Sequence, residues 1–186
     1  RIHTIRRPKP DDFQIKEAAE IIKKSKKPII IAGGGIFYSD ATEELSTFAT
    51  RHNIPVTQTV MGYSSIKQDH SHYLGTIGGL GGKAANNLSK ETDTAIAIGT
   101  KLADFTTGSW ANFENSEFKL VSINAARFDA NKHMAQAIVG DAKVSLVELS
   151  QALGNWKADD NWYKKSRVEL KNWEAYVEKE SGPTNQ

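Results

Sequence analysis

The chain has 186 residues, which fits one domain of ordinary size. Hydrophobic residues make up 39% and charged residues 25%, which excludes disorder over most of the length and predicts a soluble globular protein. The net charge of +2 lacks the broad basic excess of nucleic-acid-binding proteins. The sequence has no cysteine, which excludes disulfides and thiolate sites and favours a reducing, cytoplasmic setting. No apolar run approaches the ~20 residues of a membrane span, so we expect no membrane contact.

Both ends of the sequence have the composition of linkers. Pro8 and Pro10 punctuate a basic start that is unlike a signal peptide, and the chain closes on Ser-Gly-Pro-Thr-Asn-Gln. We therefore expect a piece of a longer protein. Residues 1–12 are predicted to be a linker from an upstream domain, 13–154 a domain of their own, and 155–186 a helical linker towards a downstream domain.

The first third of the chain predicts two helices and two strands. Asp11 or Asp12 is placed to cap the first helix, whose apolar face comprises Ile15, Ala18, Ala19 and Ile22. A continuous apolar strand follows at 29–32, and residues 54–60 predict the second strand. Between them, Asp40 and Glu43 have the spacing of a capping box, before a helix whose inner face is Leu45, Phe48, Ala49 and His52.

The rest of the chain continues the alternation of helices and strands. Residues 62–82 predict a polar and then glycine-rich loop without a regular element. A short helix is expected at 83–90, and strands at 94–98, 118–123 and 137–139. Asp141 is expected to cap a helix that ends at Gly154 and buries Ala142, Leu146, Leu149 and Leu153.

The last predicted helix runs from Trp156 to Lys179. It carries one apolar stripe, which consists of Tyr163, Leu170, Trp173 and Val177. Two interpretations remain open for this helix. It packs on its own domain, or it docks on a neighbouring one.

These elements predict an α/β fold with an open parallel sheet flanked by helices, of the Rossmann-like kind. Strands without alternation need cover on both faces, so Ile29–Ala32, Thr94–Ile98 and Leu120–Ile123 are expected in the centre of the sheet.

Gly33, Gly34 and Gly35 follow the first strand, where doubly wound folds bind phosphates through backbone N–H groups. Tyr38 stands where a dinucleotide fingerprint needs its last glycine, so NAD is disfavoured. A tight strand-to-helix turn is the simpler interpretation.

No catalytic or metal site is recognisable in the sequence. Ala84 stands where a P-loop needs Ser or Thr, and His70 and His72 lack a third metal ligand, so we interpret them as surface loop histidines. Four carboxylates are spread over separate turns, where capping explains them: Asp93, Asp104, Asp129 and Asp141.

A series of short motifs nevertheless resembles the central domain of thiamine-diphosphate enzymes of the acetohydroxyacid synthase type, over about residues 10–155. In order, the motifs are Pro28-Ile-Ile-Ile-Ala-Gly-Gly-Gly35, His72-Tyr-Leu-Gly75, Thr94 to Asp104 with Thr107-Gly108, and Val139-Gly-Asp-Ala142. Within that family, Gly108-Ser-Trp110 and Ile123 to His133 are most similar to the branch that opens a cyclic diketone by hydrolysis in inositol catabolism.

The resemblance implies a homo-oligomeric parent enzyme with three α/β domains and a small-molecule substrate. Thiamine diphosphate would sit between the first and third domains, held by a glutamate of the first and by a G-D-G…N motif with magnesium in the third. The nearest approach here is Gly140-Asp141-Ala142, so no ligand of either group carries over. We expect the chain to be a non-catalytic central domain that binds neither cofactor and contacts the parent's other domains and subunits.

In some relatives the central domain holds FAD or ADP. The matching positions are Gly33, Gly34, Gly35, Gly99 and Lys101, which we predict to form a vestigial nucleotide or anion cleft. Lys101 stands where those relatives have an arginine, whose guanidinium forms two parallel hydrogen bonds, and Asn124 stands where they have an acid that would bind the ribose. FAD is therefore not expected. The alternative function is a free-standing adenine-nucleotide binding module.

Overall fold

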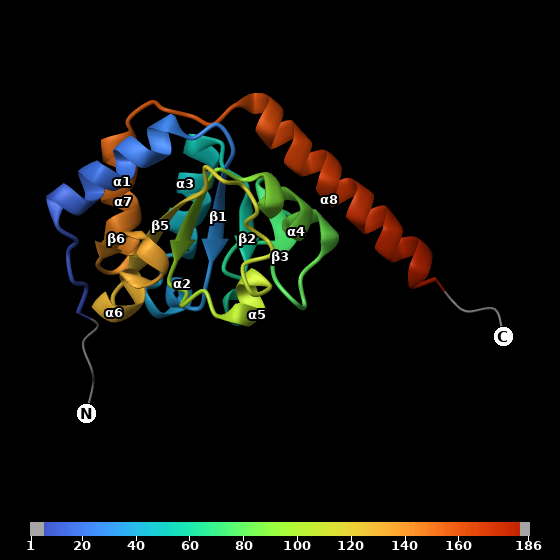
Figure 1. Cartoon of the computed structure of the whole chain (residues 1–186), viewed down its shortest axis with the longest axis horizontal. Helices are drawn as coiled ribbons and strands as arrows, with labels where there is room; N and C mark the ends of the chain where they lie inside the picture. Colours follow the sequence, from blue (N-terminus) through green and yellow to red (C-terminus); the bar gives the residue numbers. More distant parts are fainter. Residues whose placement is uncertain (1–5, 183–186) are drawn as a thin grey trace.

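One six-stranded parallel sheet organises the molecule (Figure 1). The computed structural model describes residues 6–182. Across the sheet the strands run in the order β3-β2-β1-β4-β5-β6, and neighbouring strands are parallel throughout. The predicted fold class is confirmed, and so are the three predicted central strands, which are β1, β4 and β5. The strands are β1 Pro28–Ala32, β2 Val56–Gln58, β3 Tyr73–Thr76, β4 Thr94–Ile98, β5 Lys119–Asn124 and β6 Gln136–Val139.

Helices cover both faces of this sheet. The long ones are α1 Asp12–Lys24, α3 Thr42–His52, α4 Lys83–Glu91, α7 Ala142–Leu153 and α8 Asp160–Glu180. Single turns connect the strands at α2 Gly35–Tyr38, α5 Asp104–Thr107, α6 Arg127–Ala130, and the 3-10 turns Val60–Gly62 and Lys132–Met134. Because side chains alternate along a strand, Ile30 of β1 packs in the cluster of α1, α3 and α7, whereas Ile29 and Ile31 pack in that of α4 and α8.

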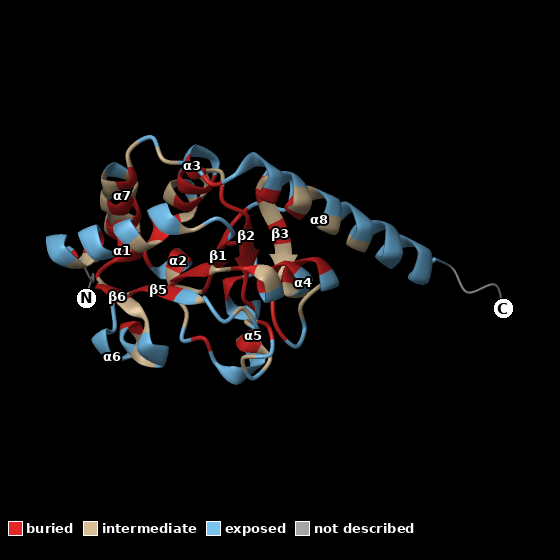
Figure 2. Cartoon of the chain, turned by 45° about the horizontal axis from the view of Figure 1, so that its top comes forward, coloured by how far each residue is buried: buried red, intermediate tan, exposed pale blue. Residues whose placement is uncertain are grey.

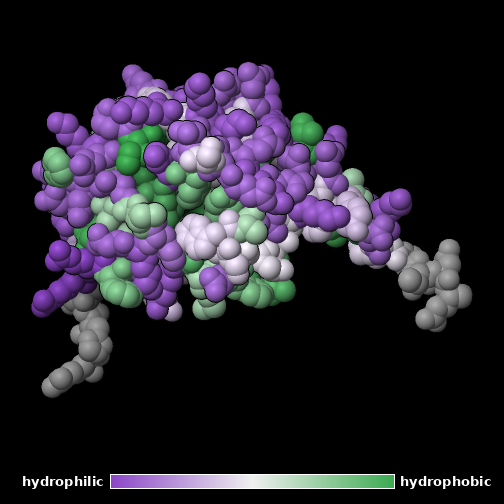
Figure 3. Space-filling view, viewed as in Figure 1, coloured by the Kyte–Doolittle hydropathy of each residue, from purple (hydrophilic) through white to green (hydrophobic). Residues whose placement is uncertain are grey.

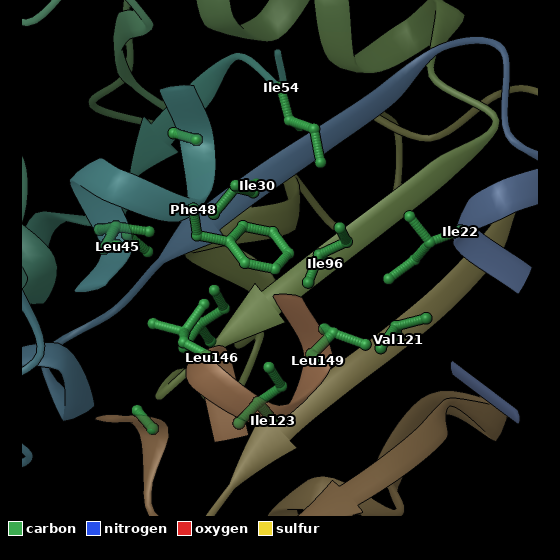
Figure 4. Packing of buried hydrophobic residues seen from close by; sticks show 14 of the residues in the cluster. Ile22, Ile30, Leu45, Phe48, Ile54, Ile96, Val121, Ile123, Leu146 and Leu149 are labelled. Carbon is green, nitrogen blue, oxygen red and sulfur yellow. The ribbon is translucent and has the colours of Figure 1, made fainter. Parts of the chain in front are cut away.

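The core under α1, α3 and α7 follows the predicted faces closely (Figure 4). All four predicted inner residues are buried in each of these helices. The caps also agree: the side chain of Asp11 accepts from the N–H of Phe13, and that of Asp141 from the N–H of Val144. Helical periodicity and caps were therefore sufficient to predict this layer.

The predicted capping box at Asp40 and Glu43 is wrong. The N-cap of α3 is Ala41, without a side-chain hydrogen bond. The short helix α2 places Asp40 at the junction of two helices with a φ of 50°, a left-handed conformation that Asp tolerates better than most residues. Its carboxylate pairs with Lys143 of α7 at 3.3 Å instead.

The second prediction that fails is the loop at 62–82, since β3 lies inside it. This edge strand pairs Val56 with Tyr73 and Thr57 with Gly75, so Leu74 is the extra residue of a bulge. Gly75 has a φ of 102°, a left-handed conformation that suits glycine. A bulged strand lacks strict alternation, which explains why the pattern did not reveal it. The second strand is also shorter than predicted, because Val60 already belongs to the 3-10 turn.

Both edge strands are covered by a helix side chain. The N–H of Val139 in β6 donates to Oε1 of Gln14 in α1 at 2.9 Å. At the other edge, Nη1 of Arg167 in α8 donates to the carbonyl of Tyr73 in β3 at 2.7 Å. Such contacts occupy backbone groups of the edge strands that could otherwise pair with strands of other chains.

Helix α8 lies half on the domain and half beyond it (Figure 2). Trp162 and Leu170 are buried, and Nε1 of Trp162 donates to the carbonyl of Pro28 at 2.8 Å. Of the predicted stripe, Leu170 is buried, Tyr163 and Trp173 are half-buried, and Val177 is exposed. Residues 174–182 are all exposed. Packing on this domain is therefore confirmed for the first half of the helix. The second half projects, and its docking on a neighbouring domain stays a prediction. The predicted boundary at 154/155 stays a prediction.

Candidate functional site

A cavity of about 950 Å³ opens at the carboxyl ends of the strands. The turns that follow β1, β2, β4 and β5 line it, and it lies where the strand order reverses between β1 and β4. Ligands of open α/β sheets bind at this kind of switch point. Gly34, Gly35, Gly99 and Lys101 are among the lining residues, whereas Gly33 is not. The two predicted segments thus converge, but ligand binding by them stays a prediction.

The glycines are explained by how closely the turns after β1 and β4 approach each other. A Cβ on Gly33 would lie 2.4 Å from the carbonyl oxygen of Gly99. A Cβ on Gly35 would lie 2.5 Å from the Cα of Gly99. Gly99 itself has a φ of 62°. Any side chain at Gly33 or Gly35 would displace backbone, so these positions require glycine whether or not a ligand binds.

The expectation that the turn's backbone N–H groups are accessible is wrong for two of them. The N–H of Gly33 donates to the carbonyl of Ile98 at 2.8 Å, and that of Gly35 donates to the carbonyl of Gly99 at 3.0 Å. The close approach of the two turns satisfies these donors internally. An anion in the cleft would depend largely on Lys101, which is exposed.

Asn124 braces the cavity at the end of β5. Its Nδ2 donates to the carbonyl of Thr100 at 3.3 Å, and its Oδ1 accepts from the N–H of Ala126 at 3.0 Å. A carboxylate here would keep the second bond but face the Thr100 carbonyl without a proton to donate. The amide at Asn124 therefore has a structural role that the sequence reasoning missed.

Large apolar side chains surround the mouth of this cavity. Tyr38 is 83% exposed and Met61 is 78% exposed, and Phe37, Val60 and Phe105 are also exposed. Figure 3 shows pale and green atoms gathered at the end of the molecule where α2 and α5 lie. Apolar patches of this kind mark surfaces that another molecule or domain covers. The sequence reasoning missed this apolar rim, whose members lie in the turns that follow β1, β2 and β4.

The scattered carboxylates have structural partners. Asp93 accepts from the backbone N–H groups of Lys26 and Lys27 at 2.8 and 3.1 Å, which holds the turn between α1 and β1. Asp141 caps α7 as predicted and also pairs with Arg7 at 3.1 Å. Asp129 pairs with Lys132 at 2.8 Å within one turn, so it is engaged in an ion pair and not in a cap. Asp104, the first residue of α5, is likewise not its cap.

The described residues do not fit a metal or thiamine diphosphate site. Within 6–182 there is no group of three or more His, Asp or Glu residues that could hold a metal ion. The magnesium that holds a diphosphate needs several oxygen ligands. Across the same range, the helices are too short or too polar to cross a membrane.

The prediction of surface histidines in the loop before β3 is wrong for His72, which is only 6% exposed. Nε2 of His72 lies 3.2 Å from Oδ1 of Asn53 at the end of α3. His70 is half-buried, with Nε2 3.3 Å from Oγ1 of Thr50. Their partners lie far away in the sequence, which explains why the loop pattern gave no indication of burial.

The two segments that carry the closer resemblance meet in space. The rings of Trp110 and His133 contact each other with centroids 4.6 Å apart. Both residues, with Ser109 and Met134, have a positive φ between 52° and 70°. Non-glycine residues rarely adopt this conformation, so each pair is held by its surroundings. The sequence indicated both segments but not their contact.

Comparison with known proteins agrees with this fold. The family model for the central domain of thiamine pyrophosphate enzymes matches residues 15–149. A 3D-(3,5/4)-trihydroxycyclohexane-1,2-dione hydrolase of Clostridium perfringens is 45% identical over 153 residues, which are 82% of this chain and 24% of the relative. A protein of Bacillus cereus, named as hydrolase 1 of the same kind, is 44% identical with the same coverage.

A Bacillus anthracis hydrolase of that name is 43% identical over the same 82% of this chain and 24% of its own length. The chain thus spans about a quarter of the curated relatives that it matches. None of these comparisons supports the alternative of a free-standing adenine-nucleotide module. The family match, the strand order and the switch-point cavity agree, and the chain belongs to the family of thiamine pyrophosphate enzyme central domains.

Proposed function

We propose that this chain is the central domain of a thiamine-diphosphate-dependent hydrolase that opens the ring of trihydroxycyclohexane-dione in inositol catabolism. The observation that carries the proposal is 45% identity to a hydrolase of that name over 82% of this chain. The contact between Trp110 and His133 supports it, because it joins the two segments that are typical of this branch.

The role proposed for the chain within that enzyme is structural. The parent adds water to a cyclic diketone and breaks a carbon–carbon bond of the ring. Thiamine diphosphate, bound with magnesium by domains outside this chain, supplies the carbon nucleophile. The described residues do not fit these groups, so the contribution we propose for the chain is a rigid layer and contact surfaces.

The partners we propose are the other domains and subunits of a homo-oligomeric parent. Two surfaces support this: the apolar rim of the cavity, with Tyr38 and Met61, and the projecting half of α8, with Tyr176 and Val177 exposed. Both leave apolar area in water that a neighbouring domain would bury. The substrate is a small molecule, and neither nucleic acid nor membrane is a proposed partner. A cytoplasmic location is proposed from the absence of cysteine.

Substrate choice by the full-length parent tests the proposal. The purified parent, supplied with thiamine diphosphate and Mg²⁺, is incubated with trihydroxycyclohexane-1,2-dione or with pyruvate, the kind of keto acid used by acetohydroxyacid synthases. Mass spectrometry follows loss of each compound. We expect hydration and ring opening of the dione and no condensation of pyruvate. Turnover of pyruvate with an untouched dione would overturn the proposed substrate while leaving the family intact.

A further inference from the structure

Three segments meet at the point where α8 begins: the end of α3, the turn before β3, and the first turns of α8. Asn53 joins them from a left-handed position, with a φ of 57°. Its Nδ2 donates to the carbonyl of Ala158 at 3.2 Å and to Oδ1 of Asp160 at 2.9 Å. Its Oδ1 lies 3.2 Å from Nε2 of His72. One amide therefore ties α3 both to α8 and to the histidine turn.

These bonds determine which nitrogen of His72 carries the proton. Because Nδ2 of Asn53 faces two acceptors, its Oδ1 faces His72, and Nε2 of His72 must be the donor. In the neutral ring Nδ1 then accepts from Oγ of Ser71, 2.9 Å away. The ring also lies against Tyr163 of α8, with centroids 4.6 Å apart, and the Tyr163 hydroxyl donates to the Ser71 carbonyl at 3.1 Å.

His70 is held in the neutral state by a stricter requirement. The backbone N–H of His72 donates to Nδ1 of His70 at 3.1 Å, so this nitrogen must be without a proton. The other nitrogen, Nε2, lies 3.3 Å from Oγ1 of Thr50 in α3. A proton on Nδ1 would replace an acceptor by a donor and break the bond that shapes the turn before β3.

Burial is the main reason why both rings favour their neutral forms, and charges of both signs surround them. On α8, Arg167 and Asp160 face the turn, and Asp69 lies in the turn itself, whereas α3 contributes uncharged partners. Burial, together with the neighbouring His70 and Arg167, lowers the pKa of His72 to about 4. Burial also lowers the pKa of His70, although a backbone carbonyl of α3 and Asp69 oppose this.

From this geometry we propose that His70 and His72 form a clasp that holds α8 on the domain while both rings are neutral and releases it on acidification. Release would uncover the side of the sheet on which Trp162 and Leu170 pack. It would also free the projecting half of the helix from its fixed direction. The clasp is thus a conformational device in the fold, and it does not depend on the parent's activity.

Amide hydrogen exchange of the 186-residue chain, corrected for the intrinsic effect of pH, tests the clasp. The readout is protection of α8 residues 160–172, with α1 as the internal reference. A histidine whose pKa changes from 6.5 when released to about 4 when held favours release about 30-fold at pH 5 relative to pH 7.5. We expect the protection of α8 relative to α1 to fall by about that factor.

The matched variant keeps the hydrogen bonds and removes the titration. In His70→Asn/His72→Gln, the Asn carbonyl replaces the Nδ1 acceptor of His70 and the Gln amide replaces the Nε2 donor of His72. We expect the protection of α8 relative to α1 not to change between pH 7.5 and pH 5 in this variant. His133→Asn, at an exposed histidine outside the clasp, should respond to pH like the wild type.

A second variant tests the proposal even if the double variant does not fold. Asn53→Gly retains the left-handed residue and removes the amide, so α8 should be less protected already at pH 7.5, with α3 unchanged. The proposal is overturned if α8 and α1 of the wild type lose protection by the same factor. It is also overturned if α8 protection in the wild type does not depend on pH, or if it depends on pH as strongly in the double variant. Asn53→Gly overturns the proposal if its α8 is as protected at pH 7.5 as that of the wild type.

Discussion

The two faces of the sheet are covered in different ways. On one face, α1, α3 and α7 each bury a complete apolar stripe and pack side by side over the strands. On the other face, only α4 and the first half of α8 pack over the strands. The rest of that face is covered by the segment between β4 and β5, through the half-buried side chains of Trp110, Phe113 and Phe118. The first layer is therefore closed by itself, whereas the second continues into the projecting half of α8, which we propose contacts another domain.

The largest expected effect is a loss of packing in the closed layer. Phe48 of α3 is 1% exposed and lies among the residues shown in Figure 4. Replacing it with Ala should lower the free energy of unfolding by about 3–5 kcal/mol, because a large cavity remains. Urea denaturation followed by circular dichroism measures this. Phe37→Ala, at a side chain 45% exposed, is the control and should change it by less than about 1 kcal/mol. Equal effects would contradict the proposed layer.

A smaller effect is expected where α8 joins the second layer. Trp162→Phe retains most of the ring but removes the bond from Nε1 to the carbonyl of Pro28. Leaving that carbonyl unpaired should lower the free energy of unfolding by about 1–3 kcal/mol. Trp173→Phe, at the half-buried ring near the projecting end, provides the comparison and should have a smaller effect. If Trp173→Phe were the more damaging variant, the projecting half would be the better anchored.

The closed layer should also weaken in acid, through His52. Nδ1 of His52 donates to the carbonyl of Trp156 at 2.8 Å, and burial lowers the pKa of the ring below its usual 6.5. The unfolded chain therefore binds the proton first as the pH falls. The contribution of His52 to stability is complete above about pH 6.5 and is lost below it. Urea unfolding at pH 7.5 and 5.0 should show a decrease that persists in His70→Asn/His72→Gln. A variant as stable at pH 5.0 as at pH 7.5 would contradict this assignment.

The same contrast explains what the sequence could predict. The stripes of α1, α3 and α7 follow from local periodicity, and so do the three central strands, because each signal lies within one element. The errors concern residues with distant partners: His72 is buried by α3 and α8, and the N–H of Gly35 is used by the turn after β4. A cleft was predicted from the glycines after the first and third predicted strands, but its apolar rim depends on how four turns come together, which no single segment shows.

The smallest expected effect concerns flavin in the cavity. The side-chain amide of Asn124 already bonds to the backbone of the turns after β4 and β5. Lys101 cannot form the two parallel hydrogen bonds that an arginine would form. We expect FAD to bind with a Kd on the order of millimolar or weaker, about −4 kcal/mol. Quenching of tryptophan fluorescence during titration measures this. Micromolar binding, or flavin that copurifies in stoichiometric amount, would show that the cavity recognises adenosine by other groups.

The central claim is that this chain provides structure and not chemistry to a ring-opening enzyme. The direct measurement is ring opening of trihydroxycyclohexane-1,2-dione by the purified 186-residue chain with added thiamine diphosphate and Mg²⁺, beside the full-length parent under the same conditions. The account predicts product from the parent and none above the uncatalysed rate from the chain alone. Ring opening by the isolated chain, or a parent that is inactive on the dione, would contradict it.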